Sequence, residues 1–245
     1  MQNIYDNPVF FEGYSRRRER AVNANNLFEI PARMALLPDL AGMAVLDLGC
    51  GTGEDCFEYA RRGAAKVVGI DISENMLSVA REKNADPRVE YRCLPMERVF
   101  ELEGPFDLAV SALALQYVED FAGVVKAVYD LLKPGGRFVF SQENPINTCF
   151  TTGERWTKDA AGNKLWANLS NYSVDGARES TWFVDGVKKY HRTFSTIVNT
   201  LVDAGFVVER LIEPIPDEAT LAAHPDRSKD LLHKPDFLVV RARKR

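Results

Sequence analysis

The stretch V-L-D-L-G-C-G-T-G, Val45 to Gly53, joins an apolar run directly to a segment with the pattern of a helix. Val45 to Leu48 predict a buried strand, and the acidic Glu54 and Asp55 favour the positive start of a helix. Between them lie three glycines, Gly49, Gly51 and Gly53. Glycine allows a sharp turn and lets a ligand approach the backbone. The stretch therefore predicts a strand, a ligand-binding loop and a helix.

An acidic residue follows at the position that this kind of loop requires. Asp71 lies 22 residues after Gly49, at the end of a second predicted strand over residues 66–70. A carboxylate at this place can accept both hydroxyls of a ribose. The spacing G-x-G-x-G is one residue shorter than the dinucleotide fingerprint G-x-G-x-x-G. The glycine loop and Asp71 together predict a nucleoside ligand. The alternative is a tight turn and a helix-capping acid without a ligand.

The rest of the chain alternates strand and helix patterns, which is typical of an α/β fold with a parallel sheet. Further strands are predicted over residues 89–93, 106–112, 137–141, 206–212 and 237–240, with helices after Ser73, after Glu119 and over residues 193–204. We expect a single domain of residues 1–245, divided into an N-terminal, partly helical segment (1–43), a ligand-binding core (44–144), an insertion (145–190) and the C-terminal part of the sheet (191–245).

The insertion breaks the regular alternation. Residues 145–190 contain three tryptophans, scattered glycines and little periodicity, so they predict an irregular segment rather than another strand–helix repeat. Long irregular segments inside compact domains are often lids. We therefore expect residues 145–190 to cover a binding pocket.

Composition narrows the class of protein. The 245 residues carry a formal net charge of −4, so a nucleic-acid partner is not expected. The N-terminus lacks the apolar stretch of a signal peptide and no window resembles a membrane span, which predicts a cytoplasmic protein without a membrane partner. The four cysteines show neither paired spacing nor neighbouring histidines, so no metal site is predicted.

Four ordered motifs resemble the class I S-adenosylmethionine-dependent methyltransferases, in particular the type 11 group that is similar to the ubiquinone and menaquinone methyltransferases. They are V-L-D-L-G-C-G-T-G (45–53), V-G-I-D-I-S (68–73), F-D-L-A-V-S-A-L-A-L-Q-Y-V (106–118) and L-K-P-G-G-R-F-V-F (132–140). The resemblance implies a Rossmann-like, seven-stranded, mostly parallel sheet with helices on both faces and an antiparallel last strand. It also implies a cofactor, S-adenosylmethionine, whose product is S-adenosylhomocysteine, and methyl transfer to a small molecule.

The resemblance assigns the cofactor site residue by residue. Asp71 is expected at the ribose and Ile72 on the adenine, while Asp47 lies beside the ammonium group or ties down the glycine loop. Many relatives carry aspartate where this chain has Pro95, which is a departure at the adenine. The full expected set is Tyr14, Asp47, Gly49, Cys50, Gly51, Gly53, Asp71, Ile72, Met76, Pro95, Met96, Glu97, Ser111 and Ala112.

The insertion and its end provide candidates for the acceptor pocket, namely Tyr172, Arg178, Trp182, Tyr190, His191, Arg192 and Thr193. His191 is the candidate catalytic residue because histidine can take a proton at neutral pH, but it can equally pack against the following helix. Arg178 and Arg192 fit either an anionic substrate or structural ion pairs with Glu143 or Asp185. Relatives often have histidine where Gln116 stands.

Two other functions remain compatible with these residues. An NAD-dependent oxidoreductase uses the same kind of loop and ribose acid, although the glycine spacing is against it. A non-catalytic cofactor-binding or regulatory protein would keep the nucleoside site and lack transfer. The sequence specifies neither the acceptor nor the atom that is methylated.

Overall fold

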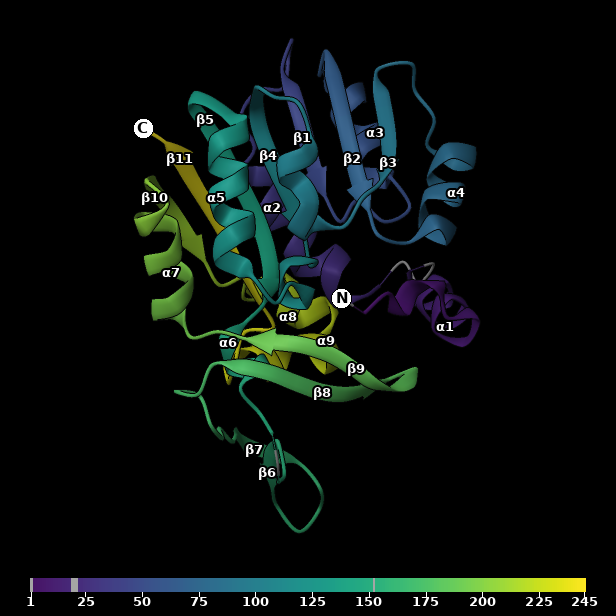
Figure 1. The fold of residues 1–245 in the computed structure, drawn as a ribbon. Coiled ribbons are helices and arrows are strands. Elements are labelled where there is room, and N and C mark those ends of the chain that lie inside the picture. Colours follow the sequence, from purple (N-terminus) through teal and green to yellow (C-terminus); the bar gives the residue numbers. More distant parts are fainter. Residues whose placement is uncertain (1, 19–21, 152) are drawn as a thin grey trace.

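A seven-stranded sheet forms the centre of the protein (Figure 1). The computed structural model describes residues 2–18, 22–151 and 153–245, so parts of the predicted N-terminal segment (1 and 19–21) and of the insertion (152) lie outside it. The strand order is β10-β11-β5-β4-β1-β2-β3. The strands are β1 (Ala44–Leu48), β2 (Lys66–Asp71), β3 (Val89–Cys93), β4 (Phe106–Ala112), β5 (Leu132–Glu143), β10 (Phe206–Ile212) and β11 (Phe237–Lys244).

The predicted direction of the strands is confirmed. β11 pairs antiparallel with both β5 and β10, whereas β1, β2, β3, β4 and β5 pair in parallel. The expected strands at 89–93, 106–112 and 206–212 have these bounds in the structure. β5 and β11 are longer than predicted. β5 begins at Leu132, which pairs with Phe106 of β4, and β11 keeps its charged end in the sheet because it pairs with both β5 and β10.

Helices cover both faces of the sheet. The main ones are α2 (Ile30–Ala35), α3 (Glu54–Arg61), α4 (Glu74–Lys83), α5 (Phe121–Leu131) and α7 (Phe194–Asp203). Successive residues of a strand point to opposite faces. Accordingly, Leu46 and Leu48 pack in a cluster with α5 and α7, whereas Val45 packs in a second cluster with residues of α3 such as Tyr59. The buried strands therefore have a core on each face, as a parallel sheet requires.

The insertion is not another strand–helix repeat, as predicted, but it contains more regular structure than its sequence suggests. Residues 145–191 contain a short helix α6 (Pro145–Thr148) and two antiparallel hairpins, β6 (Trp156–Lys158) with β7 (Lys164–Ala167) and β8 (Gly176–Trp182) with β9 (Val184–His191). In β8, half-buried and exposed residues alternate, but the half-buried ones include glycine, arginine and serine. Because these are not apolar, the period of two is hidden in the sequence.

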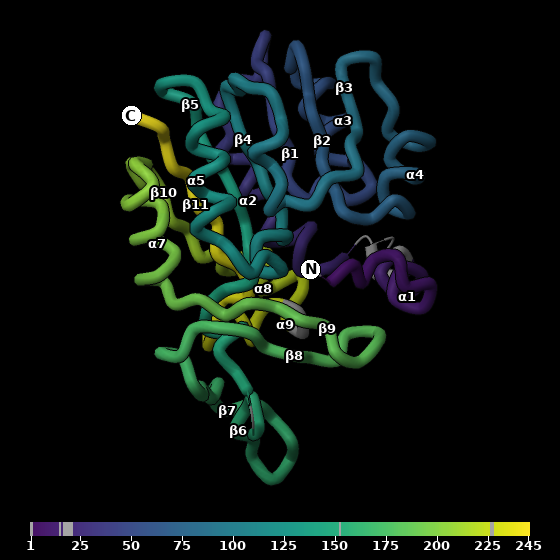
Figure 2. Tube along the Cα trace, in the orientation of Figure 1, coloured from purple at the N-terminus to yellow at the C-terminus, as the bar shows by residue number. Residues whose placement is uncertain are grey.

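The N-terminal segment lies beside the β8–β9 hairpin of this insertion (Figure 2). It comprises the turn η1 (Ile4–Asp6), α1 (Pro8–Arg18) and η2 (Asn25–Glu29). The side chain of Gln2 donates a hydrogen bond of 2.8 Å to the Gly186 carbonyl and accepts one of 2.9 Å from the Lys188 amide. Residues 2–14, which we call the strap, therefore hold the β8–β9 hairpin.

Short elements complete the chain. They are η3 (Met96–Glu101), η4 (Leu115–Tyr117), α8 (Glu218–Ala223), α9 (Pro225–Ser228) and η5 (Lys229–Leu232). Within the described ranges, we find no helix with the length and apolarity that a membrane crossing needs.

The glycine turn after β1 yields a stability prediction. Gly49 has φ +72°, and a Cβ there would lie 2.5 Å from the Cβ of Ala114, whereas Gly42 has φ +75° and open space. Both substitutions to alanine incur the cost of left-handed backbone, about 1–2 kcal/mol. Gly49→Ala adds overpacking of about 1–3 kcal/mol. Urea unfolding without ligand should show the larger loss for Gly49→Ala, and equal losses would contradict the close approach.

Candidate functional site

A cavity of about 580 Å³ lies at the carboxyl ends of the parallel strands. The chain passes from β1 to β2 and β3 on one side and then returns to β4 and β5 on the other, so the loops after β1 and β4 diverge. Such switch points are the usual ligand sites of open α/β sheets. Gly49 and Gly51 follow β1, Asp71 ends β2, Ala112 ends β4 and Glu143 ends β5, and all of them line the cavity.

The glycine loop presents bare backbone to this cavity. The amides of Gly49 and Cys50 both donate to the Ile70 carbonyl, over 2.8 and 2.9 Å, which folds the loop back onto β2. Gly51 has φ +54°, and a Cβ added there would meet no atom within 4 Å. Gly51 therefore leaves space that a ligand can use.

Asp71 connects the glycine loop to the start of α4. Its two carboxylate oxygens accept the amide of Gly51 and the amide of Ser73, each at 2.9 Å. Burial raises the pKa of Asp71, and the backbone hydrogen bonds oppose this shift. Each carboxylate oxygen has a second lone pair, so Asp71 can still accept ligand hydroxyls.

Asp47 is a buried acid with an unused oxygen. Its Oδ2 accepts from the Cys56 thiol at 3.3 Å, while its buried Oδ1 has no hydrogen-bond partner. Burial raises the pKa of Asp47 to about 7, to which the negative charge of Asp55 contributes, whereas Arg33 acts in the opposite direction. Buried polar atoms without a partner are costly, so Oδ1 is suited to a donor supplied by a ligand.

A buried ionic network beside Asp47 was not predicted. Arg33 of α2 is only 1% exposed and donates to Glu29 (2.7 Å), Asp55 (2.7 Å) and the Tyr59 hydroxyl (3.0 Å). Glu29, Arg33 and Asp55 also line the cavity. The sequence does not indicate this ionic network, because Glu29, Arg33 and Asp55 are brought together only when α2 packs on α3.

The residues at this end fit the expected cofactor. The unpartnered Asp47 oxygen suits an ammonium group, Asp71 suits a ribose, and the open space over Gly51 suits a close approach of ligand to backbone. Of the predicted set, those that line the cavity are Tyr14, Asp47, Gly49, Cys50, Gly51, Asp71, Ile72, Met76, Met96, Glu97 and Ala112.

Three predicted residues do not line the cavity and make structural contacts instead. The Ser111 hydroxyl donates to the Leu48 carbonyl at 2.9 Å and thereby ties β4 to β1. Gly53 caps α3 with φ +77° and accepts the Tyr91 hydroxyl at its carbonyl. Pro95 precedes the η3 turn. Their contacts explain these residues without a ligand.

The geometry of His191 does not support a catalytic base. The ring is fully buried and does not line the cavity. Nε2 lies 2.8 Å from the Tyr172 carbonyl and must donate to it, so Nδ1 accepts from the Thr148 hydroxyl at 2.8 Å. Burial lowers the pKa of His191. With both nitrogens engaged, the alternative of a packing role fits the structure.

Of the other candidates for the acceptor pocket, some line the cavity and others do not. Arg178 and Trp182 line the cavity, whereas Tyr172, Tyr190 and Thr193 do not. Thr193 instead caps α7, and its hydroxyl accepts the Thr196 amide.

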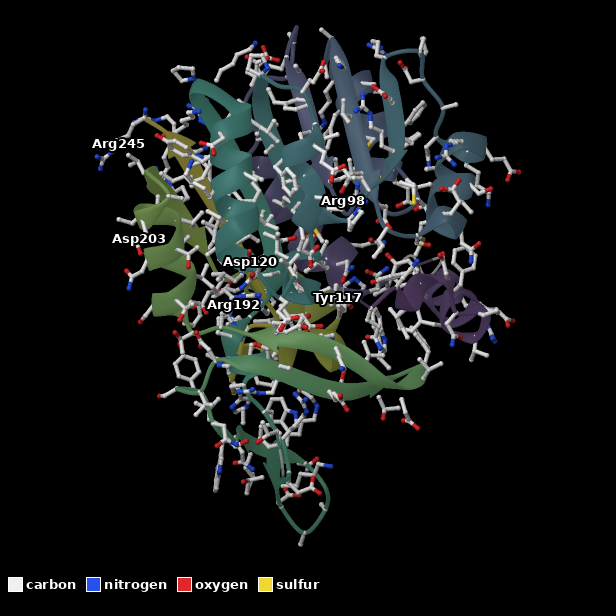
Figure 3. All side chains as sticks on the ribbon, viewed as in Figure 1. Arg98, Tyr117, Asp120, Arg192, Asp203 and Arg245 are labelled. Carbon is white, nitrogen blue, oxygen red and sulfur yellow. The ribbon has the colours of Figure 1, made fainter. Side chains whose placement is uncertain are left out.

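The proposed ion pairs of Arg192 and Arg178 are wrong. Arg192 is buried beside the η4 turn, near Asp120 (Figure 3), and donates to the carbonyls of Val118 and Glu119. Burial lowers the pKa of Arg192 to about 10. Glu143 pairs with Lys189 at 2.5 Å, and Asp185 accepts from the Thr181 hydroxyl.

Aromatic residues of the strap, Tyr5 and Tyr14, form part of the cavity wall. Tyr5 packs edge-on against Tyr14 (5.2 Å) and Tyr117 (6.2 Å), and Phe10 packs against Trp182 (5.2 Å). Tyr5 and Tyr117 were missed as lining residues. The concentration of aromatic residues near the N-terminus was the available signal, but it does not indicate which surface they cover.

Comparisons with known proteins show which family the chain resembles. Residues 45–136 match a family model described as a methyltransferase domain. A solved S-adenosylmethionine-dependent methyltransferase from Mesorhizobium loti is 40% identical with a TM-score of 0.79, covering 88% of this chain and 97% of that one. A structure from Listeria monocytogenes, assigned to the same class, is 36% identical with a TM-score of 0.79, covering 89% and 98%.

A functionally described relative matches over a shorter region. The ubiquinone biosynthesis O-methyltransferase of Acinetobacter baylyi is 42% identical over 109 residues, which are 43% of this chain and 45% of that enzyme. The match thus covers less than half of either protein.

The unpartnered oxygen of Asp47 predicts a pH-dependent cofactor affinity. An ammonium group binds the ionised carboxylate, and the pKa of Asp47 in the free protein is about 7. Below this pH a proton must leave before the ligand binds, so affinity falls by up to about tenfold per pH unit. Calorimetry with S-adenosylhomocysteine from pH 8 to pH 6 should show this loss. Asp47→Asn should bind weakly with little pH dependence, and a flat wild-type profile would refute the assignment.

Proposed function

The chain belongs to the S-adenosylmethionine-dependent methyltransferases. We propose that its cavity holds S-adenosylmethionine at the glycine loop and a small-molecule acceptor next to the insertion. The enzyme transfers a methyl group from this cofactor. Membership of this family sets aside the oxidoreductase alternative. The observation that carries the proposal is the cavity itself, because residues of the glycine loop and of the β8–β9 hairpin line one continuous space.

The cofactor end of the cavity performs binding and orientation. S-adenosylmethionine supplies an electrophilic methyl group on a sulfonium centre. Asp71 accepts the ribose hydroxyls, and Asp47 accepts the ammonium group through its free oxygen. Glu97 lines the cavity with a buried Oε2 that has no partner, so it takes the adenine amino group where many relatives use an aspartate at the position of Pro95.

The acceptor end aligns the nucleophile and excludes water. Displacement at a methyl group depends mainly on in-line positioning, which a closed pocket supplies. Residues 145–190, the lid, contribute Thr148, Arg178 and Trp182 to the lining. The strap contributes Tyr5 and Tyr14, and it contacts the lid through Gln2 and Phe10.

Gln116 orients the acceptor. Its side chain is 4% exposed and lines the cavity, its Nε2 donates to the Leu113 carbonyl at 2.6 Å, and its Oε1 has no partner. The amide is therefore fixed with an acceptor oxygen available to an N–H or O–H of the substrate. An amide does not take up a proton at neutral pH, so Gln116 positions the nucleophile where a histidine of the relatives could also deprotonate it.

Asp71 gives the first test of the cofactor assignment. Asp71→Asn keeps the side-chain shape but replaces a charged acceptor by an amide, and a charge-assisted hydrogen bond contributes about 1.5–3 kcal/mol. Binding of S-adenosylhomocysteine should weaken by about tenfold or more. Asp130→Asn, on the exposed face of α5, is the matched control. Unchanged affinity in folded Asp71→Asn would overturn the ribose assignment.

The lid and strap give a second test, by hydrogen exchange. If they close over the ligands, amides of residues 2–14 and 176–191 should exchange more slowly when S-adenosylhomocysteine is bound. The buried strand β4 should exchange equally in both states and serves as the internal control. Identical exchange of the hairpin with and without ligand would show that it is not a lid.

A further inference from the structure

The charged side chains at the lid end of the cavity differ in whether they have an ion-pair partner. Three acids line this end, and each has a lysine partner: Glu143 pairs with Lys189 (2.5 Å), Asp236 with Lys234 (3.8 Å) and Glu179 with Lys188 (3.9 Å). Two arginines, Arg155 and Arg178, also line it. Neither has a carboxylate within ion-pair distance among residues 2–18, 22–151 and 153–245. The two arginines are therefore the cations at this end without a described carboxylate partner.

Arg178 contributes charge but no available donor. Its guanidinium donates to the carbonyls of Cys149, Asn171, Val174, Gly176 and Ala177. These five hydrogen bonds use all five N–H groups of the side chain. Arg178 thus fastens the lid and places a cation beside the cavity without an N–H for a ligand.

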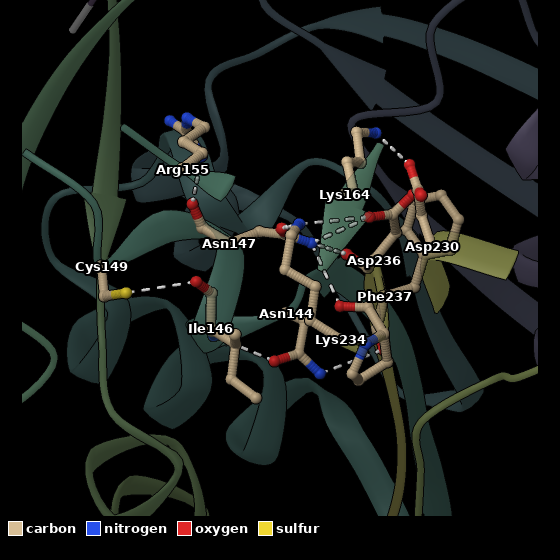
Figure 4. A network of polar contacts seen from close by, with 11 residues as sticks. Asn144, Ile146, Asn147, Cys149, Arg155, Lys164, Asp230, Lys234, Asp236 and Phe237 are labelled. Atoms are coloured by element: carbon tan, nitrogen blue, oxygen red, sulfur yellow. Dashed lines mark hydrogen bonds and ion pairs between the residues drawn. The ribbon is translucent and has the colours of Figure 1, made fainter. Parts of the chain in front are cut away.

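Arg155 has the donors that Arg178 lacks. Figure 4 shows its guanidinium bonded to the Asn147 carbonyl, and this 3.1 Å bond is its one described hydrogen bond. The guanidinium also lies 5.1 Å from the centre of the Phe150 ring, and both residues line the cavity. Nε and the second terminal nitrogen therefore remain available for a planar anion, which arginine binds with two parallel hydrogen bonds.

The support for Arg155 is itself fixed to the body of the protein. Asn147 donates through Nδ2 to the carbonyl of Pro235 (3.1 Å) and to Oδ1 of Asp236 (3.1 Å), and it accepts from Lys234. Burial lowers the pKa of Lys234; the charge of Asp236 opposes this shift, and the charge of Arg155 adds to it. Asn147 thus holds the guanidinium of Arg155 against a fixed part of the protein.

We propose that the methyl acceptor carries a carboxylate or phosphate group and that Arg155 binds this group at the lid end of the cavity. The inference rests on the proposed function, since it concerns the second substrate of the same cavity. The cofactor end is acidic, because Glu29, Asp47, Asp55, Asp71 and Glu97 line it, with Arg33 as the counter-charge of the ionic network. A cationic cofactor and an anionic acceptor are thereby directed to opposite ends.

The experiment uses the full-length protein saturated with S-adenosylhomocysteine and three probes of similar shape, which are benzoate, phenyl phosphate and the neutral benzamide. Calorimetry should show at least one anion binding about tenfold or more tightly than benzamide, with affinity falling as salt is added. Arg155→Gln should remove this preference, and Arg155→Lys should retain part of it, because lysine keeps the charge but not the planar fork.

The controls separate the possible failures. Arg210→Gln changes an exposed arginine outside the cavity and should leave the preference intact. Equal affinity of the three probes for the wild type, or an anion preference that persists in Arg155→Gln, would overturn the proposed anion site. A protein that does not bind S-adenosylhomocysteine at all would instead overturn the cofactor site on which the inference rests.

Discussion

The position of β1 between β2 and β4 is the constraint on which the rest of the structure depends. Parallel pairing on both sides makes β1 a central strand, which is buried on two faces. Its one charged residue, Asp47, is therefore shielded from solvent. The same pairing makes the chain leave in opposite directions after β1 and after β4. The ligand cavity and the raised pKa of Asp47 therefore have one origin, the topology of the sheet.

The features that could be predicted correctly from the sequence depend on residues close together in the chain. The glycine loop and Asp71 are adjacent to strands with strong apolar patterns, and parallel strands place their carboxyl ends at one edge without further information. The lid was predicted as a cover but not as two hairpins, since its strands are largely exposed and lack apolar alternation. His191 shows the same limit, because only the tertiary fold places Thr148 and Tyr172 against its two nitrogens.

The missed site residues share a physical cause. Tyr5, Arg33 and Arg155 come from segments that contain no strand of the main sheet, and they reach the cavity through long-range packing. An arginine in a sequence looks the same whether its partner is a carboxylate, as for Arg33, or a carbonyl, as for Arg155. Its contribution to the electrostatics of a site follows only from the partners that the fold provides.

The strap contacts both the cofactor end and the lid end of the cavity. Asp6 accepts the hydroxyl of Ser73 at 2.5 Å, two residues after Asp71, while Gln2 holds the β8–β9 hairpin. Any displacement of the strap therefore affects both the cofactor contacts and the acceptor cover. Because Tyr5 and Tyr14 of the strap also line the cavity, the position of the strap and the binding of ligands are expected to be coupled.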